Sequence, residues 1–482
     1  MLKTLPKYFP LLDHLYIYQI LEYNIEDFFR WFLKNPFKRF LQKKHKLVIS
    51  NKIIALLVFT IFWQLVTAFI FYSLTQSLIV FLIAFILIQP LTPIFIIMAD
   101  LSLDPYEVYL KNKVLKKAEE KLKKLSNLKV VAITGSFGKT STKDILYTLL
   151  WKKYYVVKTP KSFNTPLGIA QTILEDLKDN SDIFICEVGA YKIGEIKNIC
   201  NLIKPKIGII TAIAPQHLEK FGSIENIAQA KFELPQSLGG DGVAILNSNF
   251  EQIKNLSSTL NSKIIFYGEA SSSAYGTEGD KYYGTDIKTG IEGTSFTLHT
   301  PKGKTEIQIP LIGKHHVQNF LAATAAALQL GLTLSEIKDR AKLLLPTPHR
   351  MDIKKVGNMT IIDNSFNTNP KSAESSLNLL ESFKNARKIV ITPGFVELGE
   401  KGAEENEKFG EEIACVADEV IIVGENAKKD LLSGIKKVWP DEPNNTTHLV
   451  SSTQEALILA QQLANDTKVV VLLENDLPDQ YN

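Results

Sequence analysis

The 482-residue chain has little cysteine, and its charges nearly balance. Its three cysteines, Cys186, Cys200 and Cys415, form no CxxC pair and show no metal-ligand spacing. Their number and spacing exclude a disulfide framework and favour a reducing, cytoplasmic compartment. The formal net charge is only +4, so the composition does not indicate a nucleic-acid-binding protein.

Charged residues are missing from the whole stretch between Ile53 and Ala99. A membrane-spanning helix needs about 20 apolar residues, so this stretch has room for two. We predict spans at about 53–74 and 78–98, joined by the short polar turn SLTQS. The stretch begins too late in the chain, and is too long, for a secretory signal peptide.

Basic residues flank this predicted hairpin on both sides, and its turn has no Lys or Arg. From Trp31 to Lys52 there are seven Lys or Arg and no Asp or Glu. By the positive-inside rule we expect a multi-pass protein of the cytoplasmic (inner) membrane, with both ends and all later domains in the cytoplasm. Residues 8–46 mix aromatic with basic residues and either lie along the lipid headgroups or form an ordinary juxtamembrane linker.

After residue 126, short β-branched runs alternate with helical patterns, which predicts doubly wound, mostly parallel α/β sheets. Residues 271–310 are rich in Gly, Ser and Thr and indicate a small antiparallel excursion. The alternation restarts after residue 350 and predicts a second, smaller sheet. We therefore expect a membrane-anchoring region at 1–125, a central α/β domain at 126–345 and a Rossmann-like α/β domain at 346–482. The expected strands lie at 128–134, 154–159, 182–188, 206–213, 242–247, 263–268, 294–300, 305–310, 359–364, 388–394, 418–425 and 468–475.

The stretch AITGSFGKTST, residues 132–142, follows the first strand and opens a helix. It is two residues shorter than the common phosphate-binding loop, and a bare GKT is frequent by chance. The position of this stretch between a strand and a helix is stronger evidence for phosphate binding than the GKT letters. At such a turn the backbone N–H groups and the helix N-terminus point toward a bound anion. Lys139 would reach the outer phosphates of a nucleotide, and Thr140 would offer its hydroxyl to Mg²⁺. The expected phosphate-binding residues are Gly135, Ser136, Gly138, Lys139, Thr140 and Ser141.

Polar residues also stand near the ends of later strands, where ligands gather in an open α/β sheet. Glu187 ends one strand and is either a Mg²⁺ ligand or a solvated acid. His217 follows the next strand and taken alone would be a structural or exposed histidine. Lys231 lies on a predicted helix, where a lysine is ordinarily on the surface. Their order along the chain favours a single site.

These residues belong to a longer ordered series of stretches that includes CEVGAYKIGEI, HLEKFGSIENIAQAKFEL, GKHHVQN, PHRMD, DNSFNTNP and VELGE. Together with TGSFGKTST they resemble the Mur ligase superfamily, the ATP-dependent enzymes that build peptide onto cell-wall precursors. Among its branches the chain is most similar to the one that adds D-alanyl-D-alanine to a muramoyl tripeptide. The resemblance covers about residues 128–400.

The resemblance implies a role for each matching residue. Lys139 would hold the β- and γ-phosphates of ATP, while Thr140 and Glu187 would hold one Mg²⁺. His217 would hold a second Mg²⁺ together with Lys231, which matches a lysine that is carbamylated in the family. The resemblance makes Lys139, His217 and Lys231 the expected catalytic residues.

It also implies contacts from more distant segments. Asn319 would contact the adenine, and Arg350 and Asp363 would reach the phosphates and ribose from the C-terminal domain. Asn367 matches the loop that shapes that side of the nucleotide site. Asn164 and Thr165, in the loop SFNT, would lie near the acceptor substrate.

The chemistry implied by the resemblance is activation of a carboxylate by ATP, followed by attack of an amine on the acyl-phosphate. The expected partners are a muramoyl-peptide-like or lipid-linked acceptor, an amino acid or dipeptide amine, membrane lipid and other cell-wall enzymes, with no nucleic acid. A hairpin stands where the family has its uridine-nucleotide domain, so both a UDP-linked and a lipid-linked acceptor stay open.

Four positions depart from the family pattern: His316 replaces Asn, Asn364 and Phe366 replace Asp and Tyr, and Asn406 replaces His. They put the nucleotide contacts and the second substrate in question more than the reaction type. Two other functions also stay open: a folylpolyglutamate-synthase-like ligase, and a membrane-tethered nucleotide-binding scaffold without activity.

Overall fold

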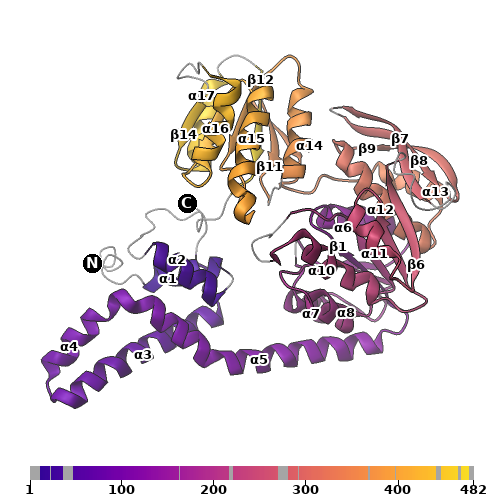
Figure 1. Ribbon diagram of the computed structural model, residues 1–482. Coiled ribbons are helices and arrows are strands. Elements are labelled where there is room, and N and C mark those ends of the chain that lie inside the picture. The colour runs from indigo at the N-terminus through magenta and orange to yellow at the C-terminus, as the bar shows by residue number, and fades with distance from the viewer. Residues whose placement is uncertain are drawn as a thin grey trace. The chain divides into compact units, whose positions relative to one another are not determined.

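The computed structural model describes residues 11–21, 23–35, 47–161, 163–215, 221–269, 281–290, 292–366, 370–396, 398–440, 447–464 and 468–476 (Figure 1). The chain divides into two compact units. The first comprises residues 1–113 with 477–482, and the second runs from Val114 to Asp476.

The first unit is helical throughout its described residues. Its core joins α1 and α2 to the base of the long helices, where Leu15 and Phe28 pack with Ile53 and Ile96. The Tyr18 hydroxyl donates to Asp100 at 2.7 Å and fixes α1 against the same base. The helices are α1 Leu11–Ile20, α2 Ile25–Lys34, α3 Asn51–Thr75, α4 Leu78–Leu87, η2 Gln89–Leu91 and α5 Thr92–Lys124.

Within the described residues, α3 is the one helix that is long and apolar enough by itself to cross a membrane. The second apolar stretch, predicted as one span at 78–98, is broken: α4 and the following helix meet at a bend of 43°. Pro90 lies in the break, where its missing N–H interrupts the helical hydrogen bonds. Counting the bent pair as one span gives two by length and composition.

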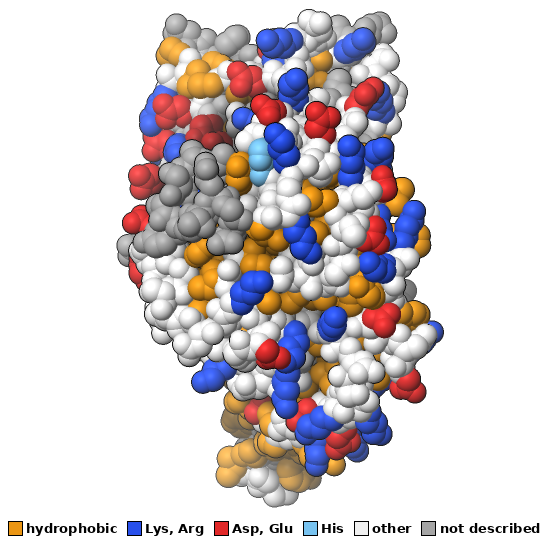
Figure 2. Space-filling view, turned by 90° about the vertical axis from the view of Figure 1, so that its right-hand side faces the viewer, with side chains coloured by type: hydrophobic (Ala, Val, Ile, Leu, Met, Phe, Trp, Pro, Cys, Tyr) orange, Lys and Arg blue, Asp and Glu red, His pale blue; other side chains and the backbone are white. Residues whose placement is uncertain are grey.

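Large apolar side chains on α3 and α4 are exposed, among them Phe62, Phe69 and Ile86. Figure 2 shows hydrophobic side chains gathered at its lower end, where these helices lie. The buried face of α3 is mixed: it carries Leu56 and Ala68, and also Gln64, whose Nε2 donates to Thr92 Oγ1 of α5 at 3.1 Å. Apolar outer surfaces with a hydrogen bond between the helices are also found in helices that pack together in lipid.

The second unit contains a nine-stranded sheet in the order β2-β3-β1-β4-β5-β6-β7-β8-β9. The first seven strands in this order are parallel, while β8 and β9 are antiparallel. The bounds are β1 Lys129–Thr134, β2 Val156–Lys158, β3 Ile183–Glu187, β4 Ile207–Ile210, β5 Val243–Asn247, β6 Lys263–Glu269, β7 Lys281–Gly290, β8 Gly293–Thr300 and β9 Gly303–Ile309.

Alternate residues of β1 enter opposite layers of the core, as the period of a strand requires. Val131 and Ile133 pack with α6, α12 and α13 on one face, whereas Val130 and Ala132 pack with α7 and α8 on the other. The helices are α6 Lys139–Leu150, α7 Pro166–Glu175, α8 Glu195–Ile203, α10 Ile224–Gln236, α11 Glu251–Ser257, α12 Lys314–Gln329 and α13 Leu334–Ala341.

The structure confirms only part of the predicted antiparallel excursion, the strands β8 and β9. β7 was not predicted, and it pairs in parallel with β6 before the chain turns back into β8. The Gly- and Thr-rich stretch therefore extends the main sheet and does not form a separate one.

The C-terminal sheet has six strands in the order β10-β11-β15-β12-β13-β14, all parallel except the β10–β11 pair. Helices α14, α15 and α16 cover one face and α17 the other. These two sheets confirm the predicted mixed α/β class, although β10 and β14 were missed. The bounds are β10 Asp352–Val356, β11 Met359–Asn364, α14 Pro370–Glu381, β12 Arg387–Thr392, η4 Gly399–Lys401, α15 Gly402–Val416, β13 Glu419–Val423, α16 Lys428–Val438, β14 Thr447–Val450, α17 Thr453–Leu463 and β15 Val469–Glu474.

Candidate active site

The predicted site residues of the central sheet gather beyond the carboxyl ends of β1, β3 and β4, which are neighbours in the sheet. Residues 135–138 follow β1, Glu187 ends β3, and residues 211–214 follow β4. Open α/β sheets bind ligands at this edge, because the loops there leave the strands toward solvent.

Two glycines shape the loop between β1 and α6. Gly135 has φ +150° and Gly138 has φ +80°. A Cβ on Gly135 would lie 2.0 Å from Thr211 Oγ1, and one on Gly138 would lie 2.5 Å from Asn319 Oδ1. Neither position accepts a side chain, so this short loop closes tightly and turns its backbone into the first turn of α6.

Ser136 ties the loop to the segment after β4. Its N–H donates to the Ala212 carbonyl at 2.8 Å, and its hydroxyl donates to the Ala214 carbonyl at 2.9 Å. The Ala214 N–H in turn donates to the Ser136 hydroxyl at 3.0 Å. Ser136 is 1% exposed, so its role in this structure is to hold the loop's shape.

Lys139 opens α6, and its Nζ donates to the Gly135 carbonyl at 2.6 Å. Burial lowers the pKa of Lys139; the Glu187 carboxylate opposes this shift, and the charge of Arg350 adds to it. An ammonium held in this way inside a phosphate-binding loop would gain from an anionic partner.

Thr140 and Glu187 form an oxygen pair at the start of α6. The Thr140 hydroxyl donates to Glu187 Oε2 at 2.9 Å, and both residues are buried. The Glu187 backbone is fixed by its N–H, which donates to Thr159 Oγ1 at 3.1 Å. A hydroxyl and a carboxylate are ligands that Mg²⁺ prefers, so these two residues fit the metal that the resemblance implies.

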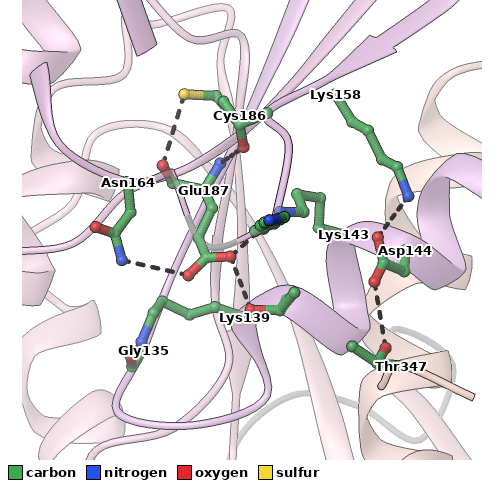
Figure 3. Close-up of polar contacts among 12 residues, drawn as sticks. Gly135, Lys139, Lys143, Asp144, Lys158, Asn164, Cys186, Glu187 and Thr347 are labelled. Atoms are coloured by element: carbon green, nitrogen blue, oxygen red, sulfur yellow. Dashed lines mark hydrogen bonds and ion pairs between the residues drawn. The ribbon is translucent and has the colours of Figure 1, made fainter. Parts of the chain in front are cut away.

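Lys143 was not predicted as a site residue, yet it lies beside Glu187. Figure 3 shows Lys143 beside Glu187, and its Nζ is 3.4 Å from Glu187 Oε2. The same Nζ also donates to the Lys161 carbonyl. Asn164 Nδ2 donates to the other carboxylate oxygen at 3.4 Å. The i, i+4 spacing from Lys139 placed Lys143 on the same helix face, and this was the signal in the sequence that could have found it.

Asn319, on α12, touches the loop from the opposite side. Its Oδ1 accepts from the Thr142 hydroxyl at 3.3 Å and lies against Gly138. Ser141 is also buried between these elements. His316, one turn before Asn319, is 3% exposed, and its Nδ1 has no hydrogen-bond partner among the described residues. Burial lowers its pKa well below the usual histidine range and so favours the neutral ring.

Lys231 is on α10 and is 6% exposed, so it is not the surface lysine that its helix position suggested. Burial lowers its pKa well below the ordinary lysine value, and the charge of Lys139 lowers it further. A lowered pKa increases the fraction of neutral amine, which is the form of lysine that reacts with CO₂.

Of the C-terminal residues, Arg350 lies in the turn between α13 and β10, and Asp363 lies near the end of β11. The Arg350 guanidinium lies over the Phe366 ring at 4.9 Å. Asp363 accepts from Lys354 at 2.9 Å and from Ser365 at 2.6 Å, and it pairs with His349 at 2.9 Å. Burial by itself would raise the pKa of Asp363, but these hydrogen bonds and charges hold it below the usual value.

Of the remaining predicted residues, Thr165 is the N-cap of α7, where its side chain accepts from the Gly168 N–H. His217 and Asn367 lie outside the described residues. Among the residues that the structure does describe, no group of three His, Cys, Asp or Glu side chains could hold a metal ion.

Asn406 has a structural function in this chain. It accepts from the Phe395 N–H at 2.7 Å and donates to the Phe395 and Gly402 carbonyls at 3.1 and 2.9 Å. It is 3% exposed, so its polar atoms stabilise the loop after β12.

Comparison with known proteins matches residues 133–327 to the Mur ligase middle domain and residues 349–473 to the Mur ligase glutamate ligase domain. The chain is 31% identical over 337 residues to the UDP-N-acetylmuramoyl-tripeptide–D-alanyl-D-alanine ligase of Escherichia coli, covering 69% of this chain and 72% of that one. The crystal structure of MurF from Acinetobacter baumannii superposes with a TM-score of 0.67 at 25% identity, covering 76% and 77% of the two chains. MurF of Thermotoga maritima in complex with ADP has the same fold, with a TM-score of 0.66 at 24% identity and coverage of 76% and 80%.

Proposed function

The chain belongs to the Mur ligase family, the ATP-dependent, ADP-forming ligases of peptidoglycan synthesis, and we propose that it joins D-alanyl-D-alanine or a similar amine to the terminal carboxylate of a muramoyl peptide. The observation that carries this proposal is the pairing of Thr140 with Glu187 at the start of α6, beside the tight loop at 135–138. The relatives named above for this reaction support the choice of substrates.

In the proposed reaction, the acceptor carboxylate oxygen attacks the γ-phosphorus of ATP, and ADP leaves. The amine nitrogen then attacks the acyl-phosphate carbon, loses a proton, and inorganic phosphate leaves as the amide forms. Lys139 would hold the γ-phosphate oxygens after releasing the Gly135 carbonyl. Positive charge aimed at these oxygens stabilises two anions as they approach one another.

Thr140 and Glu187 would hold one Mg²⁺, which supplies further positive charge to the phosphates when bound. We propose that carbamylated Lys231 and His217 hold a second. The burial of Lys231 supports this, because CO₂ adds only to a neutral amine. A carbamate would also turn the repulsion between Lys231 and Lys139 into an attraction.

The experiment that tests the ligase proposal measures phosphate release by the full chain with ATP, Mg²⁺ and a UDP-linked muramoyl tripeptide. We expect release only when D-alanyl-D-alanine is added, with one amide formed for each phosphate. Nucleotide binding without amine-dependent release would favour the scaffold instead. Release with a folate and glutamate would favour the folylpolyglutamate-synthase-like alternative.

We further propose that α3 and the bent pair α4–α5 form a membrane hairpin that holds the ligase at the cytoplasmic face of the inner membrane. The uncharged stretch from Ile53 to Ala99, the basic flanks and the exposed apolar side chains support it. Such an anchor would present the site to a lipid-linked acceptor or to membrane-bound enzymes that make the acceptor.

This proposal is tested by comparing the full chain with a truncated form, each offered lipid-linked and UDP-linked muramoyl peptides. The truncation begins just before Val114, because Ala118 of α5 and Leu125, which follows that helix, belong to the core of the central sheet. We expect only the full chain in membranes to favour the lipid-linked acceptor. An equal preference of both forms for the UDP-linked peptide would refute a lipid-linked acceptor and leave only an anchor.

A further inference from the structure

Lys143 is a cation in the interior of the central domain. Its side chain is 1% exposed, and so is that of Glu187, to which it is paired at 3.4 Å. Taking a charge out of water is expensive, and an apolar side chain at this position of α6 would pack without that penalty. Packing alone therefore does not explain a lysine here.

The second contact of Lys143 is with the segment that leads to the predicted acceptor loop. Its ammonium donates to the backbone carbonyl of Lys161, which has φ +47°. A non-glycine residue in this left-handed region is strained by about 1 kcal/mol or more and persists only when its surroundings hold it. The hydrogen bond from Lys143 helps to keep Lys161 in this conformation at the start of the loop.

The loop itself then returns to Glu187. Asn164 Nδ2 donates to Glu187 Oε1, and the Asn164 carbonyl accepts from the Gly189 N–H at 3.1 Å. A Cβ on Gly189 would lie 2.8 Å from the Asn164 side chain, so the loop packs closely on the segment after β3. Lys143 thus bridges the two ends of one arrangement: the carboxylate beside Thr140 and the strained start of the loop.

We propose that Lys143 is a positioning residue that couples the Mg²⁺ carboxylate Glu187 to Lys161 and Asn164 of the acceptor loop, so that the metal site and these loop residues are ordered together. This inference rests on the proposed function for the identity of the acceptor. The expected effect of Lys143 on Mg²⁺ binding does not rest on it. Lys143 acts only through Glu187 and the loop, because its side chain is closed off from solvent.

The expected consequence of losing the ammonium is a change in binding more than in chemistry. Residues that orient a metal ligand typically change metal affinity or activity by 10–100-fold when they are replaced. In Lys143→Met we expect the half-saturating Mg²⁺ concentration and the KM for the acceptor to rise by about tenfold or more on that basis. The kcat at saturation and the affinity for ADP without Mg²⁺ should stay within about threefold, because Lys139 and the loop at 135–138 are untouched.

The matched control is Lys158→Met. Lys158 is in the same domain and pairs with Asp144 at 2.6 Å, but its side chain has no hydrogen bond or ion pair with Glu187 or with the described residues of the acceptor loop (Figure 3). Both full-length variants are titrated with ADP by calorimetry, with and without Mg²⁺, and then assayed for ligation. The difference in ADP affinity with and without Mg²⁺ reports the effect on Mg²⁺ binding without any turnover. Thermal melting shows whether each variant is folded.

A folded Lys143→Met protein with a normal Mg²⁺ requirement and a normal acceptor KM would overturn the proposal. If that variant does not fold, Lys143→Gln keeps a donor for the Lys161 carbonyl and should fold with a raised Mg²⁺ requirement. Failure of both to fold would also overturn it, since Lys143 would then be a residue of the fold. If wild-type protein ligates no muramoyl peptide, the proposed function fails. The calorimetric comparison still decides whether Lys143 affects Mg²⁺ binding.

Discussion

Lys139→Ala is the change whose effects on activity and on stability should differ most. The Lys139 ammonium donates to the Gly135 carbonyl at 2.6 Å, and in the proposed reaction it moves to the γ-phosphate. Losing one positive group that acts on developing charge in a transition state lowers the rate by about 10²–10³, or about 2.7–4 kcal/mol. We expect at least this loss of kcat.

The stability should change little, because two effects of the substitution oppose each other. The lost hydrogen bond from a charged donor contributes about 1.5–3 kcal/mol. Burial and the charge of Arg350 disfavour the same ammonium, as its lowered pKa indicates, and the alanine variant is relieved of that penalty. A net change within about 1 kcal/mol moves the melting temperature of a domain of this size by roughly 2–4 °C.

The assay pairs amine-dependent phosphate release with thermal melting of the same preparations. Lys129→Ala is the control, because Lys129 begins the strand that leads to the loop but lies at its far, exposed end. Turnover of Lys139→Ala within tenfold of wild type would refute the phosphate-binding role. A melting temperature lowered by more than about 8 °C would refute the argument on burial, since such a drop exceeds 2 kcal/mol on the same scale.

Three further changes test other contacts. In Lys231→Met we expect ligation to be lost when bicarbonate is present. With bicarbonate removed, we expect the variant to melt above wild type at neutral pH, because the lowered pKa of Lys231 means that protonation disfavours the folded state, and this penalty fades as pH rises to the ordinary lysine range. An unchanged difference between pH 7 and alkaline pH would contradict this. Glu187→Gln leaves Lys143 buried without its carboxylate partner and should lower the free energy of unfolding by about 3 kcal/mol. The double variant with Lys143→Met should restore most of this loss. Chemical denaturation of wild type, the single variant and the double variant measures both changes. Asn406→Ala removes three hydrogen bonds to the backbone and should lower the free energy of unfolding by about 2–4 kcal/mol while leaving the Mg²⁺ requirement unchanged. A loss below about 1 kcal/mol would show that the loop after β12 keeps its conformation without these hydrogen bonds.

The amino-acid sequence by itself determined the features that depend on neighbours along the chain. The loop at 135–138 could be read directly, because a buried strand, two glycines and the first turn of a helix are contiguous. The class of fold followed from the alternation of strand and helix patterns, and membership of the Mur ligase family confirmed the predicted ATP-dependent ligase. The uncharged stretch likewise follows from composition alone, although the bend at Pro90 that divides it was not foreseen.

Other features were decided only when distant segments met. β7 lies in the stretch that the sequence indicated as a small antiparallel excursion but was not itself predicted, and its parallel pairing with β6 depends on which sheet edge the chain reaches. Asn406 looked like a substituted substrate contact, whereas its hydrogen bonds to Phe395 and Gly402 give it a structural place.

The contrast is sharpest at Lys143 and Lys231. Both stand on helices at positions where lysine is ordinarily solvated, and both are buried in the folded chain. Lys143 meets Glu187 and the Lys161 carbonyl across 44 and 18 residues of sequence. Local patterns fix which face of a helix a side chain occupies, but the charge state, burial and partners of that side chain depend on what the sheet brings against that face.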